Sequence, residues 1–187
     1  MPFDQGAPQF GVNDAKVATW INTAGVISYG TVTDVMGIQM AQATIQIISA
    51  IANGDDRIVA AAARLTGAQL QMRFVGMNPT SMSVITGVAS DTISSVINTQ
   101  YTGGERMPYF GAIIKALSEE VGDTWVFLPK CKIMSDFVIF QGEFGTFSTP
   151  EVTVQAVPDD TWGLANFITH PTDVAITVMP PANIAEV

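Results

Sequence analysis

Apolar and polar residues alternate with a period of two over several stretches of the chain, as half-buried β-strands require. The alternation is clearest at residues 68–74, where Ala68, Leu70, Met72 and Phe74 are separated by polar residues, and at Glu151–Val157. Four further apolar runs predict strands: Lys16–Ile21, Tyr29–Met36, Thr124–Met134 and Val174–Met179. Pro129 places the third of these at a sheet edge or at a bulge.

Two segments fit both a strand and a helix. Residues 36–51 alternate from Gln42 onward, but their apolar residues also follow a helical stripe. Their Ile and Thr content favours a strand. Residues 109–121 have helical spacing as well, and here we expect a strand that gives way to a turn or helical turn near Leu117–Asp123.

Turn and cap residues divide the rest of the chain. Asn22–Gly25, residues 53–56 and Thr66-Gly67 predict turns, and the alanine-rich residues 57–63 favour a helix when taken alone. Asn78-Pro79 followed by Gly87 predicts a short capped helix. A strand at Asp91–Tyr101, a turn at residues 102–104 and a strand at Met107–Ile114 would form an extended hairpin.

These elements predict one mainly β domain over residues 1–187, with the character of a β-sandwich or barrel. One short α-helix would flank it, and extended loops or hairpins would form arms. Residues 1–14 are expected to be an irregular N-terminal arm, and residues 160–187 a C-terminal arm or strand.

Charged residues make up only 13% of the 187 residues, about half the usual share, and the formal net charge is −9. Because protein interfaces are depleted in charge, this composition favours a surface covered by neighbouring subunits. The alternative is a monomer with a large core and a Thr-rich surface. With Lys and Arg totalling 8, the chain does not resemble a DNA-binding protein. No stretch is apolar enough to predict a membrane span or signal peptide.

Catalytic and metal-binding patterns are missing from the sequence. His170 is the only histidine, and Cys131 is the only cysteine, so neither a His triad nor an internal disulfide is expected. Asp55-Asp56, Asp159-Asp160 and Glu119-Glu120 are interpreted as solvated turn acids. We therefore expect no enzyme activity, no catalytic residues, no cofactor and no metal site.

Three segments together resemble the major tail-tube proteins of long-tailed, siphovirus-like bacteriophages. They are residues 42–87 with the ANGDD turn and the NPTSMSVITG helix, residues 107–133 ending in LPKCKI, and residues 141–157, QGEFGTFSTPEVTVQAV. The resemblance covers about residues 30–157.

The resemblance implies a virion protein, made in the host bacterial cytoplasm, that forms hexameric rings stacked into a hollow tail tube. DNA would pass through the tube without specific binding. Tape-measure, terminator and tip or baseplate proteins would be partners, and no membrane would be involved. The expected lumen-facing residues are Gln42, Thr44, Gln46, Gln69 and Gln71. The expected inter-subunit hairpin includes Asp91, Tyr101, Gly103, Gly104 and Tyr109.

Two alternatives remain open at this point. One is another β-rich virion component, such as a tail terminator or a capsid decoration protein. The other is a small β-barrel that binds an apolar ligand.

Overall fold

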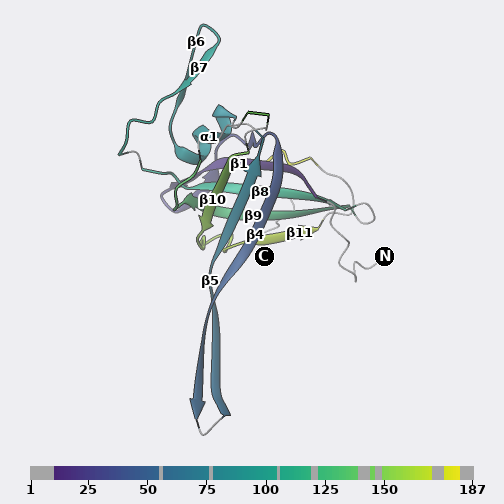
Figure 1. The fold of residues 1–187 in the computed structure, drawn as a ribbon. Coiled ribbons are helices and arrows are strands. Elements are labelled where there is room, and N and C mark those ends of the chain that lie inside the picture. The colour runs from purple at the N-terminus through teal and green to yellow at the C-terminus, as the bar shows by residue number, and fades with distance from the viewer. Residues whose placement is uncertain are drawn as a thin grey trace.

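The chain is mainly β, with antiparallel pairing and one short helix, as the alternating sequence predicts (Figure 1). The computed structural model describes residues 11–54, 57–75, 78–104, 106–118, 122–138, 144–145, 149–169 and 175–181. Its elements are β1 (Val12–Thr23), β2 (Val26–Tyr29), β3 (Thr33–Asp34), β4 (Ile38–Gly54), β5 (Arg57–Phe74), α1 (Pro79–Thr86), β6 (Ser90–Ile93), β7 (Val96–Thr99), β8 (Phe110–Ser118), β9 (Gly122–Ile133), β10 (Glu151–Ala156) and β11 (Asn166–Thr169).

One nine-stranded sheet carries most of the fold. Its order is β2-β1-β8-β9-β10-β5-β4, with β3 added to β1 and β11 added to β9. The sheet curls, so that β4 approaches β1 although the two strands do not pair in the described part of the chain. β6 and β7 form a separate two-stranded hairpin.

The main core lies between the β5–β10 half of the sheet and the β1–β8–β9 half. Phe110, Leu128, Leu70, Met72 and Val154 are fully buried there, and α1 adds Met82 and Ile85. Burying these large apolar side chains supplies the main driving force for folding. A second cluster on the other face of β1, β8 and β9 contains Ile113, Phe127 and Met179.

Both ambiguous segments are strands. β4 extends the predicted strand at residues 36–51 to Gly54, and β8 covers residues 110–118. Leu117 and Ser118 pair with Asp123 and Gly122, so the strands continue where a turn or helical turn was expected; residues 119–121 lie outside the described ranges. Pairing of β4 with β5, and of β8 with β1 and β9, decides between the two patterns.

The short helix is confirmed in detail. Asn78 caps α1 by accepting a hydrogen bond from the Thr80 backbone N–H at 3.0 Å, and Pro79 begins the helix. Gly87 ends it with φ of +75°, a conformation that glycine adopts without steric cost.

The turn predicted at Thr66-Gly67 is wrong, and so is the helical preference of residues 57–63, because β5 runs unbroken from Arg57 to Phe74. The register places Gln46 opposite Gly67 but Ile47 opposite Leu65, so Thr66 is the extra residue of a β-bulge. Pro129 likewise lies where the β8–β9 register shifts, as predicted.

Four other boundaries need correction. Residues 12–14 belong to β1 rather than to an irregular arm, and the strand predicted at 29–36 is divided into β2 and β3. Residues 91–101 fold back on themselves as β6 and β7, so they do not pair with residues 107–114. Residues 175–179 form no strand; Ile176 and Met179 instead pack onto the second cluster.

Candidate functional site

The five glutamine and threonine residues expected to act together do share one face of the sheet. Gln42 lies opposite Gln71, Thr44 opposite Gln69, and Gln46 opposite Gly67, and directly opposed residues of antiparallel strands project to the same side. β10 extends this face with Thr153 and Gln155, which lie opposite Gln71 and Gln69. We call this surface of β4, β5 and β10 the polar face.

Side-chain hydrogen bonds link the strands across the polar face. The Gln155 side-chain amide donates to Gln46 Oε1 at 2.6 Å. This bond passes over Gly67, where a Cβ atom would lie 2.7 Å from Gln155 Nε2 and 3.0 Å from Gln46 Oε1. A side chain at position 67 would therefore displace the ends of these two glutamine side chains and disturb the hydrogen bond between them.

The charges of the polar face are largely paired. Glu151 accepts hydrogen bonds from the Gln71 amide and from Arg73, whose Nη2 lies 2.9 Å from Glu151 Oε2. The hydrogen bonds from Gln71 and Arg73 lower the pKa of Glu151 from its ordinary value. The surface therefore offers amides and hydroxyls, together with an internally neutralised ion pair.

A cluster of aromatic and basic residues, which the sequence did not indicate, adjoins the polar face. Lys130 Nζ lies 4.4 Å from the ring centroid of Trp20 and 4.9 Å from that of Tyr109, and Lys132 Nζ lies 5.0 Å from Tyr109. Trp20 and Tyr109 are in edge-to-face contact. Cation–π attraction holds both lysines against the rings.

The outer halves of β4 and β5 form a two-stranded arm that projects away from the body (Figure 1). We define this β4–β5 arm as residues 47–54 and 57–65. Ile47, Ile48, Ile51 and Leu65 are 63, 66, 60 and 55% exposed. The register places Ile47 and Leu65 on one face and Ile48 and Arg64 on the other, so both faces present apolar side chains to solvent.

This exposure was not predicted, although the sequence contained a signal. Residues 35–54 carry no charge, which is unusual for a segment that extends into water. Alternation alone assigned every second residue to a core, and on the arm the described part of the chain supplies no core.

The residues expected in an inter-subunit hairpin are not brought together. Asp91 lies on β6, whereas Tyr101, Gly103 and Gly104 belong to the connection from β7 to β8. Tyr109 precedes β8, and its backbone carbonyl accepts a hydrogen bond from the backbone N–H of Trp20 at 3.1 Å. The hairpin that does exist, β6–β7, exposes Val96 and Ile97 by 65 and 53%.

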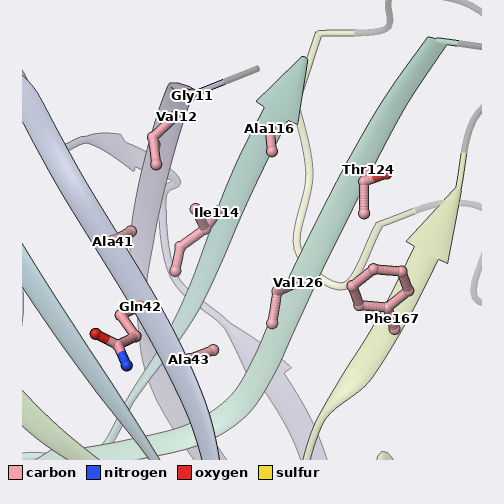
Figure 2. A pocket seen from close by; sticks show the side chains of 10 residues that line it. All are labelled: Gly11, Val12, Ala41, Gln42, Ala43, Ile114, Ala116, Thr124, Val126 and Phe167. Carbon is pink, nitrogen blue, oxygen red and sulfur yellow. The ribbon is translucent and has the colours of Figure 1, made fainter. Parts of the chain in front are cut away.

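An apolar cleft of about 440 Å³ opens between β4 and the β8–β9–β11 layer. Figure 2 shows Ala41 and Ala43 on β4 across from Ile114, Val126 and Phe167, with Val12 of β1 also in the lining. The cleft lies on the opposite face of β4 from the polar face, since Ala41 and Ala43 alternate with Gln42.

No candidate metal site is assembled within the described ranges. No three His, Cys, Asp or Glu side chains there come close enough together to hold a metal ion. Asp159 is buried rather than solvated, and its carboxylate accepts hydrogen bonds from Trp20 Nε1 and from the backbone N–H groups of Thr161 and Trp162. Asp160 is exposed, whereas Asp55, Asp56, Glu119, Glu120 and His170 lie outside the described residues.

Searches of protein-family models and of curated proteins give no match to this chain. The resemblance to tail-tube proteins therefore stays a prediction. In the described part of the chain, α1 is the longest helix, and its eight residues are too few to cross a membrane.

Proposed function

We propose that this protein is a structural virion subunit whose copies assemble into stacked hexameric rings and form a hollow phage tail tube that conducts DNA. The observation that carries the proposal is the β4–β5 arm. A two-stranded ribbon is marginally stable in water by itself, and one with two apolar faces lowers its free energy by contact with another molecule. Copies of the same chain are the partners that the resemblance implies.

The strand edges of the arm support the same conclusion. β4 is the last strand of the sheet, and its 17 residues contain neither a charged residue nor a proline. Edge strands of monomeric proteins are normally protected by such residues, because a bare edge can pair with another chain. A strand of this length without protection is typical of a subunit whose edge is covered after assembly.

The polar face suits the wall of a DNA channel. Phosphate groups are held mainly by free Lys and Arg side chains, and a conduit has to let DNA slide. Gln and Thr side chains dominate this face, Arg73 is paired with Glu151, and the adjoining lysines rest against aromatic rings. In the proposed tube this face lines the lumen, where the protein acts without enzymatic chemistry.

Electron microscopy of negatively stained purified protein tests the proposal. We expect uniform hollow tubes from the natural protein and isolated copies from a variant with Ile47→Lys and Ile51→Lys. Met36→Lys, which changes a residue that is 66% exposed in a turn outside the arm, is the matched control and should still form tubes. A natural protein that forms no tubes or rings at high concentration would overturn the proposal.

Other assemblies are distinguished by the same images. Isolated rings that do not stack would favour a tail terminator, and particles that bind only to capsids would favour a decoration protein.

The apolar cleft favours a second candidate function, the binding of a small apolar ligand. Its lining of Ala41, Ala43, Ile114, Val126 and Phe167 offers apolar contact, and Gln42 and Thr124 are its polar side chains. Native mass spectrometry of the purified protein decides this point: a single bound lipid-like mass on a monomer would favour the ligand-binding function over the tube.

A further inference from the structure

Two unsupported ribbons project from opposite ends of the molecule. The β4–β5 arm leaves one end of the body, and the β6–β7 hairpin leaves the other, beside α1 (Figure 1). Within the described residues, β6 and β7 pair only with each other. Both ribbons are short of stabilising contacts for the same reason, since among the described residues neither has a third strand or a core beneath it.

Their positions exclude contact within one copy. Because the arm and the β6–β7 hairpin extend in opposite directions, a molecule cannot cover its own hairpin with its own arm (Figure 1). Contact between an arm and a hairpin therefore joins the arm end of one copy to the hairpin end of the next copy. In the head-to-tail arrangement that the proposed function implies, such an interface is heterologous, and repeating it generates a stack.

The two ribbons also carry complementary charge. On the arm, Arg64 shares a face with Ile48. On the hairpin, alternation along β6 and β7 and the pairing of Asp91 with Asn98 place Asp91 on the same face as Val96. Each of these faces thus combines one charge with one exposed aliphatic side chain.

Neither charge is satisfied within the described part of the chain. Arg64 and Asp91 form no ion pair with any described residue. Asp91 is the only charged residue of the β6–β7 hairpin, and Arg57, the other cation of the arm, stands beside Asp55 and Asp56 in the sequence. Arg64 is the cation of the arm whose side chain lies within the described ranges.

We propose that the β4–β5 arm of one copy docks on the β6–β7 hairpin of the next copy, with Ile48 and Arg64 facing Val96 and Asp91. The contact rests on the proposed function, because it supplies the step that stacks one ring on another. The apolar side chains contribute most of the affinity, and the ion pair fixes the direction and the register of docking.

Charge exchange tests the pairing. Arg64→Asp or Asp91→Arg alone should raise the protein concentration needed for half-maximal assembly roughly tenfold, because each places like charges in contact. The double variant should return to within about twofold of the natural protein. Reversal at Asp160, an exposed turn residue outside both ribbons, is the control and should have no effect.

Cross-linking tests the contact without relying on assembly yields. Cys131 is fully buried and burial raises the pKa of its thiol, so introduced cysteines alone should react. With oxidised glutathione added as the oxidant, a mixture of Ile48→Cys and Val96→Cys proteins should form a disulfide between the two variants, because docking brings the two positions within bonding reach.

The outcomes separate this contact from self-assembly in general. Tubes that tolerate both single charge reversals, or that cross-link only through Ile48→Cys to itself or to Phe167→Cys, would overturn the arm–hairpin contact and leave self-assembly standing. If the natural protein does not assemble and the cysteine variants do not cross-link, both proposals fail.

Discussion

At the scale of single residues, Glu151 shows how the polar face depends on pH. Hydrogen bonds from Gln71 and Arg73 lower its pKa below the ordinary value of 4.5. A carboxyl whose pKa is depressed by folding stabilises the folded state at pH above its unfolded pKa. This contribution is lost as the pH falls through the folded value.

We predict that Glu151→Gln lowers the thermal midpoint at pH 7 and that the difference from the natural protein is smaller at pH 3, because protonation of the carboxyl removes its contribution. Because the pair is exposed, added salt should also reduce the difference at pH 7. Thermal unfolding followed by circular dichroism at both pH values measures it. An equal difference at pH 7 and pH 3 would show that Glu151 acts through packing rather than through charge.

Lys115 and Asp123 present the opposite situation, an ion pair inside the protein. Lys115 Nζ lies 2.9 Å from Asp123 Oδ2, and the side chains are only 5 and 1% exposed. Removing one partner leaves a buried charge without its main counter-charge, which costs far more than an exposed pair is worth.

We predict that Lys115→Met destabilises the protein by roughly 3–5 kcal/mol in urea unfolding. The double variant Lys115→Met with Asp123→Leu should recover much of that loss, because no charge remains buried. A double variant as unstable as the single one would mean that these residues are needed for other contacts.

At the scale of secondary-structure elements, the sequence predicted an element correctly where the residues that determine it lie close together in the chain. The cap of α1 is an example, since Asn78, Pro79 and Gly87 each act on backbone groups within one turn. The strand at residues 151–157 was predicted for the same reason, because its buried and exposed residues alternate along β10.

The helix cap gives a direct test. Asn78→Ala removes the acceptor for the Thr80 N–H and should destabilise the protein by about 1 kcal/mol. Asn78→Ser retains a side-chain oxygen and should lose only a fraction of that. Denaturant unfolding of the two variants compares them, and equal losses would show that the cap does not contribute through this hydrogen bond.

Elements that depend on distant partners were predicted poorly. Thr66-Gly67 has the composition of a turn, yet pairing with β4, and the pairing of the following residues 68–73 with β10, keeps the segment extended as a bulged strand. The turn between β6 and β7 is made by Ser94 and Ser95, both with positive φ, and these residues carry no strong turn signal. In each case, tertiary contacts override the local preference.

At the scale of the whole molecule, one part of the candidate site could be predicted from the sequence and two parts could not. Alternation placed Gln42, Thr44, Gln46, Gln69 and Gln71 on one face, and the strand register brings them together. The apolar arm was missed because a periodic pattern shows which residues need covering but not whether the cover comes from the same chain. The lysine–aromatic cluster was missed because Trp20, Tyr109 and Lys130 are distant in sequence and meet only across β1, β8 and β9.

The size of the particles in solution tests self-association through the arm most directly. Sedimentation velocity should compare the natural protein with a variant in which residues 47–65 are replaced by an Asn-Gly turn, a change that leaves the main core residues in place. We predict large, fast-sedimenting assemblies of the natural protein and single copies of the shortened variant at equal concentration. A natural protein that sediments as single copies at every concentration, with its arm intact, would contradict the account.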